Sequence, residues 1–318
     1  MRHTIDPDLS RLAGRRVVLT GGSDGIGRRI AERLVAAGAD VVLPVRDEAK
    51  GAGVVTALRG LRPDARVGAE RLDLASLASV TAFAARMVAD GRPVHALIDN
   101  AGLMTPPQRR VTADGFELQL GVNHLGHVAL IAGLMPVLSA GRARIVSQIS
   151  VAAASGGVHW DDLQWAERYD ATAAYRQSKI AQGLFGLELA RRSAAEGWGV
   201  TSVLAHPGVA PTNLLAAQPG YGRDEALGAR RVIGALSSLG LLLGTAESAA
   251  LPALAAATAP DTSDVQLYGP RGLGRLGGAP APQRLYRPLR DVAEARRVWE
   301  WSIEVVAARF PRATMPRV

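Results

Sequence analysis

Short apolar runs alternate with helical patterns over the first two hundred residues, and this alternation limits the fold more than any other feature. Apolar runs of strand length occur at residues 16–20, 41–45, 65–72, 94–98, 144–149 and 200–205. Helical patterns at residues 26–37, 54–61 and 77–89 separate the first four of these runs. Short buried strands separated by helices are typical of a parallel sheet covered on both faces. We therefore predict an α/β fold with a single doubly wound parallel sheet of about seven strands.

The composition excludes several classes of function. The 318 residues contain no cysteine, which excludes disulfides, thiolate nucleophiles and cysteine-ligated metal centres. The net charge is +8, but the arginines are scattered near acidic residues and only 4% of residues are aromatic, so we expect no nucleic-acid partner. Residues 1–12 lack the apolar core of a signal peptide, and the longest apolar stretch, residues 232–243, is too short to cross a membrane. We expect a cytoplasmic protein without a membrane span.

A glycine-rich turn connects the first predicted strand to the first predicted helix, with the sequence Thr20-Gly21-Gly22-Ser23-Asp24-Gly25-Ile26-Gly27. Glycine at positions 21, 25 and 27 lets the backbone approach a pyrophosphate, and the helix N-terminus offers N–H groups to the anion. A plain connector between strand and helix is the alternative. The position of the turn in the first strand–helix unit favours a Rossmann-type dinucleotide site.

The end of the second strand indicates which dinucleotide binds. A site that prefers NAD usually has Asp or Glu there, for the ribose 2′-hydroxyl. Here Arg46 follows the strand, and a cation suits a 2′-phosphate, so we expect NADP(H) to be favoured over NAD(H). Asp47 could pair with Arg46 and weaken this preference, and a solvated surface arginine is the alternative. After the third strand, Asp73 and Leu74 are placed to meet the adenine, and Asn100-Ala101-Gly102 follows the fourth strand.

A tyrosine and a lysine lie one helical turn apart at Tyr175 and Lys179. A phenol with its ordinary pKa near 10 is a poor acid or base at neutral pH, and a nearby cation favours the phenolate. We therefore expect Lys179 to lower the pKa of Tyr175. The alternative is a tyrosine packed on a lysine stem. Lysine is rare in this chain, where Lys50 is the other one.

Three further polar positions complete the candidate site. Ser150 follows a predicted strand, where its hydroxyl can hydrogen-bond a carbonyl oxygen. Asn123 lies within a helical pattern, where a polar amide can hold a water or break the local hydrogen bonding. His124 and His127 have the spacing of a metal pair, but no nearby carboxylate supplies a third ligand, so we expect no metal site.

The ordered motifs resemble those of the short-chain dehydrogenases/reductases over nearly the whole chain. They are Thr20–Gly27, Asp73, Asn100-Ala101-Gly102, Asn123, Ser150, Tyr175-x3-Lys179 and Pro207-Gly208. Within that family the chain is most similar to the retinol-dehydrogenase-like branch. That likeness rests on Asn123-His124-Leu125-Gly126-His127, on His159-Trp160-Asp161-Asp162-Leu163 between Ser150 and Tyr175, and on Leu267-Tyr268-Gly269-Pro270.

The resemblance implies a catalytic set of four residues. Tyr175 would transfer the proton at the substrate oxygen, and Lys179 would lower the pKa of Tyr175 and hold the nicotinamide ribose. Ser150 would orient the carbonyl, and Asn123 would anchor a water that links Lys179 to solvent. The residues expected to contact the cofactor are Gly21, Ser23, Asp24, Gly25, Ile26, Gly27, Arg46, Asp73, Leu74, Asn100, Ala101, Gly102, Tyr175, Lys179, Pro207, Gly208, Val209 and Thr212.

Two positions depart from the family pattern. Asp99 stands where members commonly have the first asparagine of Asn-Asn-Ala-Gly, and Ile149 stands beside the catalytic serine where a second serine is common. The isoleucine makes the local polarity of the site differ from that of its relatives.

The last hundred residues differ from the core in pattern. Residues 207–260 hold Gly/Pro loops and alanine-rich helical pieces, residues 270–288 are rich in Gly and Pro, and residues 292–306 return to a helical pattern. We predict one domain over residues 1–318. Its nucleotide-binding and catalytic core spans about 12–206, and substrate-binding loops with a C-terminal helix span about 207–318, over the carboxyl edge of the sheet.

We expect an NADP(H)-dependent ketoreductase or alcohol dehydrogenase that transfers hydride to or from a hydrophobic small-molecule ketone or alcohol. The Leu, Ala and Gly content of residues 207–288 indicates the apolar substrate. Two alternatives stay open: a catalytically silent nucleotide sensor or scaffold, and a dehydratase or epimerase that uses the cofactor transiently. Members of this family often pair through helices near Asn123 and Tyr175, so a homodimer is one possible state.

Overall fold

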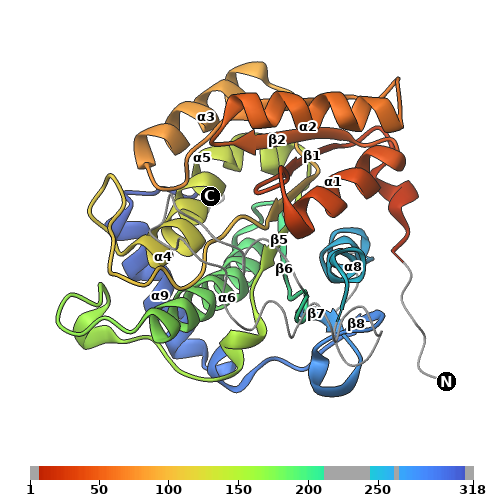
Figure 1. The fold of residues 1–318 in the computed structure, drawn as a ribbon. Helices are drawn as coiled ribbons and strands as arrows, with labels where there is room; N and C mark the ends of the chain where they lie inside the picture. Colours follow the sequence, from red (N-terminus) through yellow and green to blue (C-terminus); the bar gives the residue numbers. More distant parts are fainter. Residues whose placement is uncertain (1–6, 211–243, 261–264, 312–318) are drawn as a thin grey trace, which may run out of the picture.

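A central sheet organises the chain, which we describe from a computed structural model covering residues 7–210, 244–260 and 265–311. Within these residues the sheet has eight strands in the order β3-β2-β1-β4-β5-β6-β7-β8, all parallel except β8 (Figure 1). The strands are β1 (Arg16–Leu19), β2 (Asp40–Val45), β3 (Val67–Arg71), β4 (Ala96–Asp99), β5 (Arg144–Gln148), β6 (Thr201–Ala205), β7 (Leu267–Pro270) and β8 (Pro280–Pro282). The order is that of a doubly wound sheet, so the α/β fold expected from the sequence is confirmed.

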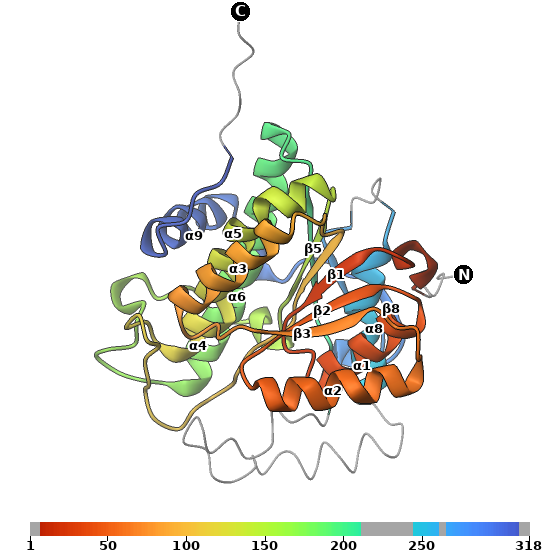
Figure 2. The same cartoon turned by 90° about the horizontal axis from the view of Figure 1, so that it is seen from above.

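The helices form a layer on each face of the sheet. They are α1 (Gly25–Ala36), α2 (Glu48–Leu61), α3 (Leu77–Asp90), α4 (Leu118–Leu120), α5 (Gly126–Ala140), α6 (Ala171–Glu196), α8 (Ala246–Thr258) and α9 (Val292–Val305). Figure 2 shows α1, α2 and α8 on one side of the sheet and α3, α5 and α6 on the other. The central strands β1 and β4 are buried along their whole length, as expected for strands covered on both faces.

Local signals fix where the main helices begin and end. Asp170 caps the N-terminus of α6 by accepting hydrogen bonds from the backbone N–H groups of Thr172 and Ala173. The helix ends at Gly197, which has a left-handed φ of 69° that glycine adopts without strain. These caps make α6 a 26-residue helix that runs from the sheet's carboxyl edge and carries Tyr175 and Lys179 in its first turns.

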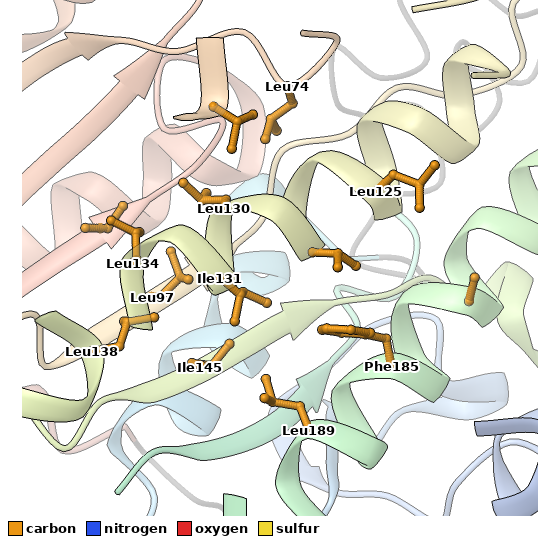
Figure 3. Packing of buried hydrophobic residues seen from close by; sticks show 14 of the residues in the cluster. Leu74, Leu97, Leu125, Leu130, Ile131, Leu134, Leu138, Ile145, Phe185 and Leu189 are labelled. Carbon is orange, nitrogen blue, oxygen red and sulfur yellow. The ribbon is translucent and has the colours of Figure 1, made fainter. Parts of the chain in front are cut away.

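Helix α5 supplies much of the core on its side of the sheet. Leu130, Ile131, Leu134 and Leu138 of α5 belong to one buried cluster with Leu97 and Ile145 of the strands and with Phe185 and Leu189 of α6 (Figure 3). The segment Leu118–Ala140 is long and apolar enough to cross a membrane, but 78% of its most apolar window is buried inside the fold. Its hydropathy therefore matches that of a core helix.

The C-terminal region differs from the sequence expectation in two ways. Substrate-binding loops were expected over about 207–318, but residues 267–270 and 280–282 form β7 and β8, which extend the sheet beyond β6. Helices α8 and α9 were expected over the carboxyl edge, but α8 packs beside α1 on one face and α9 packs against α6 on the other. The packing of α9 uses Trp299, which is 1% exposed and stacks on Phe185 with ring centroids 4.6 Å apart.

Candidate active site

One cavity of about 1140 Å³ opens where strands β1 to β6 end. Its walls come from the segments that follow these strands and from the first turns of α6. Of the described residues expected to catalyse or to contact the cofactor, Asn123 alone does not line it. Thr212 lies outside the described residues. The carboxyl edge of the sheet therefore brings the sequence-predicted positions together, as the fold rule requires.

The glycine-rich turn forms the floor of the cavity at the start of α1. Asp24 caps the helix, with its Oδ1 accepting from the backbone N–H of Gly25 at 2.7 Å. Gly21 and Gly25 have positive φ angles of 67° and 51°. A Cβ on Gly27 would lie 2.1 Å from the carbonyl oxygen of Gly21. The turn thus presents bare backbone and a helix N-terminus to the cavity, which fits a pyrophosphate group.

Asn100 and Thr20 hold this turn against the neighbouring strand. The Asn100 side chain donates to the carbonyl oxygens of Thr20 at 2.9 Å and Gly21 at 3.3 Å. The Thr20 hydroxyl accepts from the backbone N–H groups of Asn100 at 3.0 Å and Ala101 at 2.9 Å. Asn100 therefore acts on a nucleotide through the shape of the turn, because its amide nitrogen is already committed to the protein backbone.

The far end of the cavity contains the residues expected to meet the adenosine. Arg46 is exposed just after β2 and lines the cavity. Asp47, considered above as a partner for Arg46, caps α2 by accepting from the backbone N–H of Lys50 at 2.9 Å. Asp73 accepts from the backbone N–H of Ala75 at 2.9 Å, and Leu74 lines the cavity beside it. The cation of Arg46, the carboxylate of Asp73 and the apolar side chain of Leu74 thus line the same cavity.

Ser150 and Tyr175 meet at the inner end of the cavity. Ser150 follows β5 and caps a short 3₁₀ turn, with its Oγ accepting from the backbone N–H of Ala152 at 3.2 Å. Tyr175 is 6% exposed and makes a hydrogen bond with Ser150. Burial raises the pKa of Tyr175 above its ordinary value, and the bond with Ser150 partly opposes this rise.

The pKa of Tyr175 differs from the sequence expectation. Lys179 was expected to lower it, but in this structure burial sets the direction and Ser150 supplies the opposing effect. The phenol is therefore in its protonated form near neutral pH. A protonated phenol is the form that can donate a proton to an oxygen.

Lys179 follows Tyr175 by one turn on α6 and is 5% exposed. Its Nζ donates to the carbonyl oxygen of Gln148 at 2.9 Å and to Oε1 of Gln182 at 3.0 Å. Burial lowers the pKa of Lys179 to about 8, and Asp99 opposes this effect. The sequence analysis did not single out Gln182, although its position three residues after Lys179 on one helix was an available signal.

Asn123 lies in a π-helical turn, Gly121–Leu125, that joins α4 to α5. Its Oδ1 accepts from the backbone N–H of Leu103 at 2.8 Å, and its Nδ2 donates to Leu103 O at 3.0 Å and to Ser178 Oγ at 2.9 Å. A polar residue at a break in regular helical bonding was expected here, and the wide turn is such a break. Asn123 thus supports the segment after β4 rather than forming part of the cavity wall.

The two histidines near Asn123 serve separate structural contacts. His124 Nε2 lies 2.6 Å from Ser302 Oγ on α9, and His127 Nε2 lies 3.1 Å from Thr20 Oγ1. Burial lowers the pKa of each to about 3, so both are neutral at physiological pH. Among the residues that the structure describes, no three side chains of His, Asp or Glu gather as a metal site would require.

The outer part of the cavity was not anticipated from the sequence. It is lined by Leu103, Met104, Thr105, Pro107, Ser155, Thr172 and Arg176. These residues come from the segment after β4, the turn after β5 and the start of α6, and no motif marks them. Next to Tyr175, they provide mixed apolar and hydroxyl-bearing walls for a second molecule.

Known proteins share both the sequence and the fold. Residues 15–219 match the short chain dehydrogenase family. Retinol dehydrogenase 13 from Homo sapiens is 38% identical over 311 residues, which make up 96% of this chain and 88% of that protein. A crystal structure of an uncharacterized protein from Mycobacterium paratuberculosis is 33% identical with a TM-score of 0.74, and the match covers 94% of this chain and 96% of that chain. The RhlG/NADP active-site complex from Pseudomonas aeruginosa is 25% identical with a TM-score of 0.60, covering 81% and 95%.

Proposed function

The chain belongs to the short-chain dehydrogenase/reductase family, in its retinol-dehydrogenase-like branch. From this premise we propose that it is an NADP(H)-dependent ketoreductase or alcohol dehydrogenase that acts on a hydrophobic small molecule. Its membership makes it an oxidoreductase of alcohol and carbonyl groups. One observation carries the finer proposal: the same cavity is lined by the glycine-rich turn and by Ser150, Tyr175 and Lys179.

The residues present fit a nicotinamide dinucleotide. A pyrophosphate meets the backbone of the turn before α1, where a Cβ on Gly21 would lie 2.8 Å from the Asn100 side chain and leave no room. Leu74 and Asp73 line the same cavity and would meet the adenine, and Pro207, Gly208 and Val209 also line it. Bound there, the nicotinamide supplies or accepts the hydride.

The preference for NADP(H) over NAD(H) rests on charge. Arg46 lies at the end of β2, where a dinucleotide site places the adenosine ribose. A guanidinium forms strong, bidentate hydrogen bonds with a phosphate, which NAD(H) lacks at this position. The RhlG protein from Pseudomonas aeruginosa shares this fold, and its structure as an NADP complex also supports the choice of cofactor.

The chain's own groups handle the proton. In the reducing direction, a bound nicotinamide would supply a hydride to the carbonyl carbon, and Tyr175 would donate its phenolic proton to the carbonyl oxygen, which would leave an alcohol and a phenolate. Burial keeps the phenol protonated beforehand, which suits this direction. The Ser150 hydroxyl, hydrogen-bonded to Tyr175, orients the same oxygen, and the nearby Lys179 cation stabilises the phenolate until a proton returns.

The substrate class follows from the outer cavity and from the relatives. Leu103, Met104 and Pro107 give this part apolar walls, and burying apolar surface there contributes to binding. The related human protein is called a retinol dehydrogenase. We propose a neutral, largely hydrophobic ketone or alcohol whose oxygen reaches Tyr175.

The direct test compares wild-type protein with Tyr175→Phe. We expect the variant to lose turnover by about 100- to 10,000-fold, because it lacks the proton donor, while NADPH affinity changes by less than about threefold. NADPH absorbance with a panel of hydrophobic ketones measures turnover, and fluorescence titration measures affinity. Tyr169→Phe is a matched control, since Tyr169 is only half-buried and lies outside the cavity wall.

The same assay separates the alternatives. Steady NADPH oxidation that depends on Tyr175 supports the proposed reductase. Tight NADPH binding without turnover of any substrate would instead indicate a sensor or scaffold. Product formation without net cofactor consumption would indicate a dehydratase or epimerase, and full activity of Tyr175→Phe would remove Tyr175 from its assigned role.

A further inference from the structure

Asp99, the last residue of β4, is a buried carboxyl group without a hydrogen-bond partner. Its exposed fraction is 0%, and within the described residues neither carboxyl oxygen has a hydrogen-bond donor in reach. Burying a charged or polar group in this way is costly, so such a group calls for an explanation. The mechanism above does not use Asp99, and an asparagine of the same shape is common at this position in the family.

The position of Asp99 relates it to Lys179. Asp99 is paired in register with Ser147 on β5, and the next residue on β5, Gln148, accepts a hydrogen bond from Lys179 Nζ at 2.9 Å. The two groups interact electrostatically, and each favours the charged form of the other. Lys179 makes its two hydrogen bonds to neutral oxygen atoms, of Gln148 and Gln182. A neutral amide stabilises a buried ammonium less than an anion does.

The other titratable groups around Lys179 do not supply that anion. His127 faces it from α5 and is neutral because burial lowers the pKa of the ring to about 3. Tyr175 lies one turn earlier on α6 and is protonated because burial raises the pKa of its phenol. On the neighbouring strands, Asp99 is the group whose charge acts on Lys179. Burial also raises the pKa of Asp99 well above its ordinary value and so favours the neutral acid, while the charge of Lys179 opposes that rise. The carboxylate form of Asp99 therefore depends on a charged Lys179.

We propose that Asp99 is a positioning residue that acts through Lys179: its buried carboxylate holds the lysine in the ammonium form at the pH where the protein works. Opposite charges in a poorly solvated region interact strongly. Because the Asp99 carboxylate accepts no hydrogen bond from the described residues, Lys179 is the main group that stabilises its charge. The inference rests on the proposed function, because Lys179 then stabilises the phenolate of Tyr175 only while it is charged.

The scarcity of lysine provides a readout that does not depend on activity. Lys50 and Lys179 are the two lysines in the sequence. Protein labelled with ¹³C at lysine Cε therefore gives two side-chain NMR signals, and Lys50→Arg assigns them. In wild-type protein, we expect the Lys179 signal to titrate near pH 8, the pKa that burial and Asp99 together set. In Asp99→Asn we expect this midpoint to fall by about one to two pH units, a ten- to hundredfold loss of proton affinity.

Glu117→Gln is the matched control. Glu117 is also a fully buried carboxyl whose pKa is raised by burial, but it caps α4 by accepting from the backbone N–H groups of Gln119 and Leu120. Its substitution should leave the Lys179 midpoint unchanged. An unchanged midpoint in Asp99→Asn, or equal shifts in both variants, would overturn the inference.

The pH profile of activity provides the second measurement. In Asp99→Asn, the alkaline loss of kcat/KM should move to lower pH by the same amount as the Lys179 midpoint, while Glu117→Gln keeps the wild-type profile. A wild-type protein that oxidises no NADPH would refute the proposed function, and the NMR titration would still decide the role of Asp99. An active Asp99→Asn protein with an unshifted profile would refute the inference alone.

Discussion

Arg46 provides the charge on which the cofactor preference rests. It is exposed at the cavity, so its removal leaves the buried core untouched. Arg46→Ala should weaken NADPH binding by about ten- to hundredfold, the effect of losing charge-assisted hydrogen bonds to a phosphate. NADH, which lacks that phosphate, should bind the variant and the wild-type protein equally. Calorimetric titration of both nucleotides measures the difference, and equal losses for the two would show that Arg46 does not contact the phosphate.

Single residues differ in how far the sequence could predict them. Ser150 could be predicted from its place after a strand, and Tyr175 and Lys179 from their spacing of one helical turn. All three line one cavity in the structure. Gln182 was missed because an amide on a helix is most often a surface residue, and only the buried lysine beside it gives the amide a role. The raised pKa of Tyr175 was also missed, because burial depends on the whole fold and leaves no local signal.

The turn between β1 and α1 depends on the absence of side chains. A Cβ on Gly27 would lie 2.1 Å from Gly21 O and 2.5 Å from the Asn100 amide nitrogen. Any residue other than glycine at this position would therefore force the backbone of the turn to move. Gly27→Ala should therefore weaken NADPH binding by about tenfold or more, with most of the fold retained. Nucleotide titration together with circular dichroism checks this expectation.

Gly53 is a suitable comparison for Gly27. It lies exposed within α2, and a Cβ there would meet no atom within 4 Å. Gly53→Ala should leave nucleotide binding unchanged and raise the free energy of unfolding by about 0.5–1 kcal/mol, because alanine favours the helix. If both variants bound NADPH like the wild type, close backbone approach at Gly27 would not be required.

At the level of elements, prediction succeeded where the periodicity was strong. Helix α3 begins at Leu77 as expected, and β5 begins at Arg144 as expected. Strands β7 and β8 were missed because they have four and three residues and contain proline, which normally argues against a strand. Such a short segment becomes a strand because it pairs with another strand of the sheet, and the local sequence does not indicate that pairing.

At the scale of the whole molecule, buried neutral histidines make stability depend on pH. His124 has a pKa of about 3 in the folded protein and about 6.5 when unfolded, so between these values the unfolded chain binds a proton that the folded chain does not. The free energy of unfolding therefore falls as the pH decreases through this range. Relative to His124→Gln, the wild-type protein should lose about 2 kcal/mol between pH 7 and pH 5.

Urea denaturation of both proteins at the two pH values measures this difference. Glutamine keeps a polar group opposite Ser302, so it can replace the contact between the π-helical turn and α9. His127 titrates in the same direction and is present in both proteins, so its effect cancels in the comparison. Parallel pH dependences would mean that His124 does not titrate between the folded and unfolded states.

The last strand determines how the sheet meets its surroundings. Ala279 O and Gln283 N are bonded inward, to Arg271 N and Leu267 O, so the alternating residues Pro280 and Pro282 direct their backbone nitrogens outward. Proline has no N–H. At those two positions the outer edge of β8 therefore offers no hydrogen-bond donor to the backbone of another polypeptide. Growth of the sheet into fibrils or ribbons of many copies is disfavoured along that edge, without any charged residue being needed to prevent it.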